Sequence, residues 1–155
     1  MIKVPKTFIS GNKKETDKNQ KNSDISLEDL IPKSINHINC EEKIITGLVN
    51  NYYVYNPDFQ RLSEDYPLVN RMAIAKYGDN NKKIVIMEYK KQYELVDSLQ
   101  RISEYLDTYH MADRRNFLKK RLFSKNNILV WIACDDCFAE SASLYYKNLG
   151  FEPFK

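Results

Sequence analysis

The middle of the chain holds two strand-like runs separated by a turn sequence. Residues 68–77 read LVNRMAIAKY and residues 83–90 read KIVIMEYK, and GDNNK begins directly after the first run. Apolar and β-branched runs that flank a Gly- and Asn-containing segment favour a β-hairpin. A third run, ILVWIA at 128–133, is wholly apolar, which predicts a central strand buried on both faces. These three runs predict a β-sheet at the core of the fold.

The hairpin has a definite expected register. A turn centred on Asn80 and Asn81 places Ala73 opposite Glu88 on the neighbouring strand. Glu88 and Lys90 are two residues apart, so both side chains leave the same face of their strand. The end of this strand is therefore expected to present a carboxylate beside an ammonium group.

Helical spacing of apolar residues predicts four helices around these strands. They span 41 to about 55, 93–106, roughly 111–123 and 138–149. The last is expected to end at Gly150, because glycine favours a helix C-terminus. Strands that alternate with helices favour an α/β fold, here a mixed sheet with helices on both faces.

Length and composition fit one domain with a polar leader. The chain has 155 residues, of which 43% are hydrophobic and 29% charged, enough apolar material for a single core. Residues 10–26 hold almost nothing apolar, so we expect a disordered leader at 1–26 and a single domain at 27–155. No apolar run is long enough to cross a bilayer, so no membrane partner is expected. Three cysteines, two of them three residues apart, favour a reducing cytoplasm over a disulfide framework.

Positive charge is concentrated in two segments. The formal net charge is +3, and residues 1–24 carry six lysines against three acids, so the rest of the chain is balanced. Within that rest, residues 110–125 have a net charge of +5. The six bases are Arg114, Arg115, Lys119, Lys120, Arg121 and Lys125. On a helix they would cover more than half of the circumference, which suits contact with a phosphate backbone; a solvated helix face is the alternative.

Glu88 and Lys90 are the residue pair with the clearest catalytic chemistry. Magnesium-assisted hydrolysis of a phosphodiester needs a carboxylate to hold the metal ion. It also uses a cation that orients the attacking water or stabilises the developing charge. An ordinary pair of charges where a strand reaches the surface is the alternative, because charges two residues apart are common on strands.

The order of segments resembles the PD-(D/E)xK nuclease superfamily over about residues 41–155. The segments EEKIITGLVNN, NRMAIAKY, IVIMEYK, DSLQRISEYL and ILVWIA and a closing helix follow the family's order. They are similar to its acidic first helix, hairpin, strand ending in E-x-K, helix with Gln and Tyr, buried strand and last helix. The resemblance implies a restriction-endonuclease-like mixed sheet flanked by helices. It also implies a nucleic-acid substrate, DNA rather than RNA, and Mg²⁺ as the cofactor if the protein is active.

The resemblance also implies roles for individual residues. Glu88 and Lys90 match the E-x-K motif, so Glu88 would hold the metal and Lys90 the nucleophile or the transition-state charge. Gln100, with Tyr105, is similar to the Q-x-x-x-Y signature beside the phosphate, with a spacing one residue longer. Glu42, or alternatively Glu41, would match the first-helix acid that adds a metal ligand in some branches.

The chain departs from the family at its first metal-binding Asp. Where the family reads R-x-D on the strand paired with E-x-K, this chain reads Arg71-Met72-Ala73. Asp79 lies in the expected turn, about 20 Å from Glu88 along the strand, so the two cannot share a metal. The second ligand would then come from another acid, namely Asp65, Glu64, Glu41 or Glu42. Without one, the domain would be a catalytically inactive module that binds nucleic acid, a protein partner or a second copy of itself.

Cys134 and Cys137 form a C-x-x-C motif between the third strand-like run and the last expected helix. A redox pair at a helix N-terminus and half of a zinc site both use this spacing. Too few residues follow for a thioredoxin-like fold, and the chain has no second C-x-x-C pair. Buried or half-buried thiols are therefore the favoured interpretation.

The C-terminal segment ASLYYKNLGFEPF, at 142–154, resembles the A-x-x-x-Y-x-x-x-G-F ending of GNAT acyltransferases. That resemblance implies a glycine-rich turn whose amides hold the pyrophosphate of coenzyme A. Glycine occurs only at 11, 47, 78 and 150, so the chain has no such turn. A truncated GNAT-like acyltransferase is the alternative function.

Overall fold

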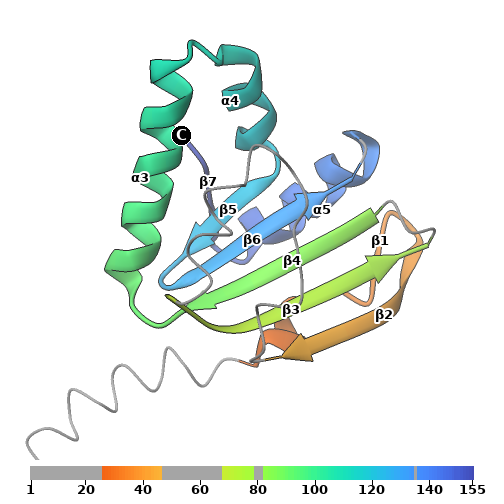
Figure 1. Cartoon of the computed structure of the whole chain (residues 1–155). Helices are drawn as coiled ribbons and strands as arrows, with labels where there is room; N and C mark the ends of the chain where they lie inside the picture. Colours follow the sequence, from red (N-terminus) through yellow and green to blue (C-terminus); the bar gives the residue numbers. More distant parts are fainter. Residues whose placement is uncertain (1–25, 47–67, 79–81, 135) are drawn as a thin grey trace, which may run out of the picture.

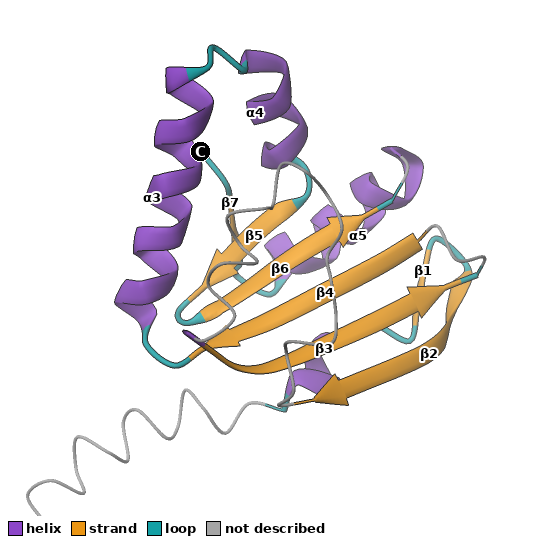
Figure 2. Ribbon diagram, in the orientation of Figure 1, coloured by secondary structure: helices purple, strands orange, loops and turns teal. Residues whose placement is uncertain are grey.

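The computed structural model describes residues 26–46, 68–78, 82–134 and 136–155. Among these residues, seven strands form one sheet in the order β1-β2-β3-β4-β6-β5-β7, and all neighbouring pairs are antiparallel. In the described ranges, three α-helices and a short 3-10 helix accompany the sheet (Figures 1 and 2). The strands are β1 Ser34–Ile35, β2 Ile38–Thr46, β3 Val69–Tyr77, β4 Lys82–Tyr89, β5 Leu122–Lys125, β6 Ile128–Ala133 and β7 Glu152–Pro153. The helices are η1 Leu27–Leu30, α3 Gln92–Thr108, α4 Ala112–Lys119 and α5 Asp136–Asn148.

The predicted hairpin, buried strand and two of the predicted helices are confirmed. β3 and β4 pair as a hairpin, and β6 lies between β4 and β5 with its side chains buried. α3 and α5 occupy the segments expected at 93–106 and 138–149. α5 ends before Gly150, whose φ of +88° suits a residue without a side chain. None of the described helices is long and apolar enough to span a bilayer.

The helix predicted from 41 to about 55 is wrong for the part that the structure describes, because Ile38–Thr46 form β2. Ile44 and Ile45 are β-branched neighbours, which fit the two faces of a strand. Ile44 packs against the core, whereas Ile45 is 45% exposed. Pairing with β3 provides the backbone hydrogen bonds, so a tertiary contact outweighs the helical spacing. Residues 47–55 lie outside the described residues, as do residues 1–25 of the expected leader.

The expected mixed sheet is also wrong, because the described strands are antiparallel throughout. The helix predicted at 111–123 ends at Lys119 as α4, and Leu122–Lys125 form β5 instead. β5 turns back through Asn126, whose φ is +54°, and pairs with β6. If α3 and α4 alone connected β4 to β6, the two strands would run parallel. The additional strand reverses the chain, so β6 runs antiparallel to β4.

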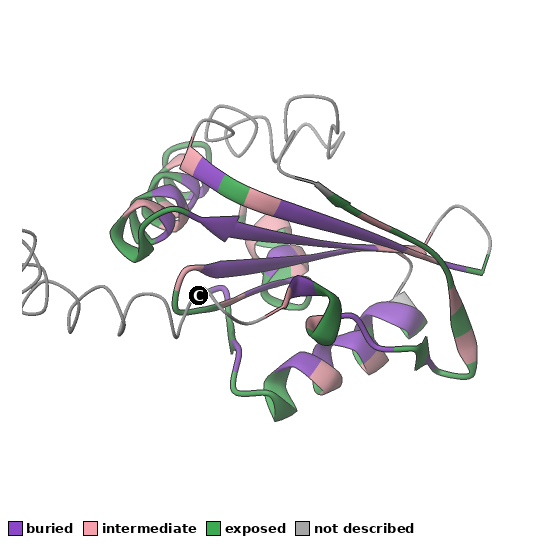
Figure 3. Cartoon of the chain, turned by 90° about the horizontal axis from the view of Figure 1, so that it is seen from below, coloured by how far each residue is buried: buried purple, intermediate pink, exposed green. Residues whose placement is uncertain are grey.

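The sheet has two buried faces with different coverings. On the face covered by α5 and η1, here called the α5 face, the core includes Ile84, Ile86 and Val130. On the face covered by α3 and α4, here called the α3 face, the core includes Val85, Met87 and Trp131. Successive residues of β4 alternate between the faces, and the strand is buried along most of its length (Figure 3). Glu88, two residues after Ile86, therefore points to the α5 face.

Two buried tyrosines attach the segment around η1 to the α5 face. The Tyr77 hydroxyl donates to the Pro32 carbonyl at 2.5 Å, and the Tyr146 hydroxyl donates to the Leu30 carbonyl at 2.8 Å. Burial raises the pKa of both phenols above its ordinary value, because the ionised form would lose its water. Both tyrosines therefore act as neutral donors in the folded protein.

Raising the pH from 9 to 11 should lower the free energy of unfolding more steeply in the parent than in a Tyr77→Phe/Tyr146→Phe variant. The unfolded chain releases the phenol protons near pH ~10, whereas the native phenols keep theirs. This stability is fully present below that pH and is lost as the pH rises towards the higher native pKa, by up to about 1.4 kcal/mol per pH unit and phenol. Urea unfolding at each pH measures the slopes, and equal slopes would contradict the prediction.

Candidate functional site

Glu88 lies at the end of β4 with a buried carboxylate that three donors of β3 surround. Its side chain is 1% exposed. The Arg71 guanidinium donates to both carboxylate oxygens, from Nε to Oε1 at 3.0 Å and from Nη2 to Oε2 at 2.5 Å. The Asn70 amide donates to Oε1 at 2.8 Å. The carboxylate thus has the counter-charge and the hydrogen bonds that a buried carboxylate needs.

A β-bulge in β3 explains how two consecutive side chains reach one carboxylate. Val69 pairs with Tyr89 and Arg71 pairs with Glu88, so Asn70 is an extra residue on β3. In a regular strand, Asn70 and Arg71 would point to opposite faces of the sheet. The bulge brings both side chains to Glu88.

The hairpin register differs from the expected one by two residues. Arg71, and not Ala73, lies opposite Glu88. β3 ends at Tyr77 as expected, directly before Gly78 with its φ of +57°, but β4 begins at Lys82, one residue earlier than expected, and Lys82 pairs with Tyr77. A loop centred one residue earlier moves every cross-strand partner by two. The position that would need a second metal-binding acid therefore holds a cation.

Among the described residues, neither predicted catalytic partner of Glu88 contacts its carboxylate. Lys90 lies beyond the end of β4, and its side chain is exposed. Gln100 is exposed on α3, and its amide donates to Glu104 at 3.2 Å. α3 covers the α3 face, whereas Glu88 points to the α5 face. The sheet therefore separates Gln100 from Glu88.

Glu42 does not complete a metal site with Glu88 either. It lies on β2 rather than on a helix, and its carboxylate pairs with the ammonium group of Lys76 at 3.1 Å. Lys76 follows Met72 and Ile74 at two-residue intervals, which places Lys76 and its partner Glu42 on the α3 face. Glu88 lies on the other face.

Magnesium does not fit the residues around Glu88. Both oxygens of the carboxylate already accept hydrogen bonds from Arg71, and Asn70 adds a third. Within the described ranges, no group of three or more His, Cys, Asp and Glu is placed to hold a metal ion. Of the other acids considered as ligands, Glu41 is exposed on β2, and Glu64 and Asp65 lie outside those ranges.

The C-x-x-C motif spans the end of β6 and the start of α5. Cys134 is half-buried, Cys137 is exposed, and both are free thiols. The expectation of buried or half-buried thiols thus holds for Cys134 and is wrong for Cys137. The Cys134 carbonyl accepts a hydrogen bond from Nε of Arg121 at 3.4 Å, which ties this segment to the basic run.

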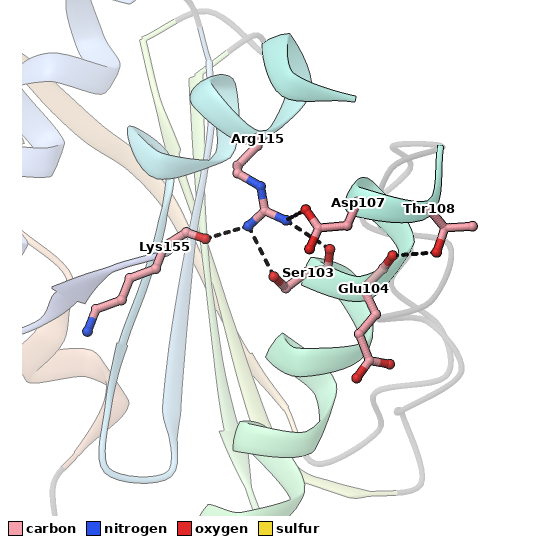
Figure 4. A network of polar contacts seen from close by, with 6 residues as sticks. All are labelled: Ser103, Glu104, Asp107, Thr108, Arg115 and Lys155. Atoms are coloured by element: carbon pink, nitrogen blue, oxygen red, sulfur yellow. Dashed lines mark hydrogen bonds and ion pairs between the residues drawn. The ribbon is translucent and has the colours of Figure 1, made fainter. Parts of the chain in front are cut away.

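The fold divides the basic run of 110–125 between three elements. Arg114, Arg115 and Lys119 lie on α4, Lys120 and Arg121 in the connection to β5, and Lys125 at the end of β5. Arg115 joins α4 to α3 and to the last residue, because its guanidinium donates to Ser103, to Asp107 and to the Lys155 backbone oxygen (Figure 4). Arg121 is 2% exposed, and its guanidinium lies 3.9 Å from the centroid of the Phe117 ring. Both arginines therefore hold parts of the fold together.

A pocket of about 540 Å³ lies between the α4–β5 connection and α5. Its lining includes Lys120, Arg121, Glu140, Ser143, Leu144 and Lys147. Arg121 and Ser143 are buried, whereas Lys120 and Lys147 are exposed. Within the part of the chain that the structure describes, neither of these lysines pairs with a carboxylate. Three cations thus line one concavity, and two of them are open to solvent.

Sequence reasoning missed Ser143 and Lys147 as site residues. They reach the pocket only because the β5–β6 hairpin brings α5 back beside the α4–β5 connection. One signal was present, since Glu140, Ser143 and Lys147 recur at helical spacing and form a polar stripe on α5. The Arg71–Glu88 pair also had a signal, because opposite charges on facing strands attract.

Comparison with known proteins yields no match to a protein-family model, to a curated protein or to a solved structure. The resemblances to PD-(D/E)xK nucleases and to GNAT acyltransferases therefore rest on sequence motifs alone. A function for this chain therefore has to be inferred from the contacts of its own residues.

Replacing Arg71 with Met should lower the free energy of unfolding by about 3 kcal/mol, because the buried Glu88 carboxylate loses its counter-charge. Lys90→Met removes an exposed cation beyond the same strand end and should change it by less than about 0.5 kcal/mol. An Arg71→Met/Glu88→Leu variant should recover most of the loss. Urea unfolding measures all three, and similar values for the two single variants would contradict a structural role for the pair.

Proposed function

We propose that the protein binds nucleic acid, with DNA as the expected ligand, through a basic surface around the pocket between α4–β5 and α5. This basic surface consists of the exposed Lys120 and Lys147 of the pocket lining, the buried Arg121 behind them, and the exposed Lys119, which precedes Lys120 in the chain. The observation that carries the proposal is the lining of one concavity by cations from two separate elements. Clusters of Lys and Arg bind nucleic-acid backbones because each phosphate contact releases condensed counterions.

The exposure of the lysines favours contact with a phosphate backbone. Lys119, Lys120 and Lys147 are exposed, so a phosphate can reach their ammonium groups without displacing other protein groups. Arg121 is held in place against Phe117 and contributes a fixed positive charge behind them. Arg115 is left out of the surface, because its guanidinium is engaged by Asp107 and the Lys155 backbone.

The contacts of the Glu88 carboxylate favour a protein that binds nucleic acid without hydrolysing it at Glu88. To hold Mg²⁺, the Glu88 carboxylate would have to release Arg71 and Asn70. The antiparallel sheet also differs from the mixed sheet that the PD-(D/E)xK resemblance implies. We therefore propose that the scaffold descends from a restriction-endonuclease-like protein. We assign no catalytic role to Lys90 or Gln100.

The full chain should bind a short DNA duplex at 50 mM salt, with an affinity that falls as salt rises. If about three phosphates contact the basic surface, log K should fall with log salt at a slope of about −3. Charge reversal by Lys120→Glu/Lys147→Glu should abolish this binding while leaving the arginine contacts of the fold in place. Fluorescence anisotropy across a salt series measures both effects.

A matched control separates the basic surface from net charge. Lys33→Glu/Lys43→Glu makes the same change in net charge at two exposed lysines outside the pocket lining. This control should bind the duplex with nearly the parental slope. Equal loss of binding in both double variants would refute the basic surface. Failure of the parent to bind at 50 mM salt would refute nucleic-acid binding and favour a protein-interaction module.

Plasmid DNA incubated with Mg²⁺ or Mn²⁺ should show no nicking that depends on Glu88. The parent, Glu88→Gln and Lys90→Ala should therefore give the same background, because the Glu88 carboxylate is committed to Arg71. Circular dichroism checks that the variants are folded. Nicking by the parent that disappears in both folded variants would restore the catalytic interpretation of the E-x-K motif.

A further inference from the structure

The pocket between α4–β5 and α5 is suited to a group smaller than a double helix. Its volume of about 540 Å³ lies within the usual range of small-ligand sites. The backbone of a duplex is convex, so its internal phosphodiesters can contact the exposed lysines at the rim but cannot enter such a concavity. A group that enters belongs to the end of a chain or to a free small molecule.

We infer that this pocket binds a phosphomonoester group, at the end of a nucleic-acid strand or on a free mononucleotide. The inference deepens the proposed function and rests on it. A phosphomonoester carries a charge of about −1.5 to −2 at neutral pH and three acceptor oxygens, whereas an internal phosphodiester carries a single charge. Three cations and one carboxylate among the described lining residues suit the higher charge.

Arg121 lines the pocket and contributes a fixed positive charge beside it. Its side chain is 2% exposed, its guanidinium stacks on Phe117, and its Nε donates to the Cys134 carbonyl. Ordering a long side chain on binding costs free energy, so a guanidinium fixed in advance favours an anion placed beside it. The proposal requires its positive charge at the wall and not the release of its present contacts.

The remaining lining residues divide into polar and apolar parts. Lys120 and Lys147 extend from the two elements that border the pocket, and their flexible ammonium groups suit the outer oxygens of a phosphate. The Ser143 hydroxyl is buried in the lining and adds a hydrogen-bonding group. Leu144, which is 60% exposed, provides apolar contact for the sugar or base that carries the phosphate.

Replacing Glu140 tests the inference by a gain of binding instead of a loss. It is exposed on α5 and is the one carboxylate among the described lining residues. Its negative charge opposes an anion in the pocket. Its removal should therefore strengthen phosphate binding, an effect that partial unfolding of a variant cannot imitate.

The decisive measurement compares duplexes that differ only at their ends. An internally labelled DNA duplex with 5′-phosphates should bind the full chain about tenfold more tightly than the same duplex with 5′-hydroxyls, the effect of one added charge-assisted contact. Adenosine monophosphate should bind in calorimetry, whereas adenosine should not. Tighter binding of the phosphorylated duplex than of the mononucleotide identifies a strand end as the ligand, and the reverse identifies a free nucleotide.

Matched variants assign the preference to the pocket. Glu140→Gln should strengthen binding of the phosphorylated duplex by about threefold, whereas Glu28→Gln, an equal charge change outside the lining, should not. Lys147→Gln should remove most of the preference for phosphorylated ends, and Lys33→Gln should keep it. A preference that survives Lys147→Gln and Lys120→Gln, or a Glu140→Gln variant no tighter than Glu28→Gln, would overturn the inference.

The two proposals fail in different ways. If the parent binds both duplexes equally and with a salt dependence, nucleic-acid binding stands and the phosphomonoester inference is wrong. If the parent binds neither duplex and neither nucleoside probe, both are wrong. Binding of adenosine monophosphate without binding of any duplex would support the phosphomonoester pocket and refute the nucleic-acid proposal.

Discussion

The central strands β4 and β6 are buried on both faces, and the rest of the structure depends on this double burial. Val85 and Trp131 belong to the α3 face, whereas Ile86 and Val130 belong to the α5 face. A strand without a solvent face needs an apolar layer on each side. α3 with α4 supplies one layer, and α5 with η1 supplies the other, where buried tyrosines hold the η1 segment by its carbonyls. The basic pocket exists because this arrangement places α5 beside the α4–β5 connection.

Double burial also changes what the E-x-K motif means in this chain. At a solvent-facing strand end, Glu88 would be open to a metal ion or a substrate. Here its carboxylate is 1% exposed, and a charge at such a depth is stable only with a counter-charge and hydrogen bonds. The bulge at Asn70 supplies both from β3. The residue with the most catalytic appearance in the sequence is therefore a structural ion pair.

The sequence predicted elements whose own apolar pattern determines their burial, and it did not predict elements that depend on a neighbouring strand. The wholly apolar β6 and the amphipathic α3 were recognisable because their own residues determine their burial. The sequence of β2 fits a helix as well as a strand, because Ile44 and Ile45 suit both patterns and only the pairing with β3 decides between them. β5 is only four residues long and follows a basic helix, so local spacing extended the helix through it. The register, and with it the partner of Glu88, depended on the residue at which β4 begins, Lys82, which pairs with Tyr77.

The pairing of β4 with β6, here called the seam, joins the β3–β4 hairpin to the β5–β6 hairpin. Glu88 pairs with Ile128 and Lys83 with Ala133, so partners across the seam are about 40 to 50 residues apart in the chain. Within the β3–β4 and β5–β6 hairpins, the strands are joined by short loops. Closing a loop of this length costs about 3 kcal/mol of chain entropy, whereas the short hairpin loops cost about 1 kcal/mol. The core of the α3 face spans the seam, with Met87 on one side and Trp131 on the other, so we expect the two hairpins to unfold together.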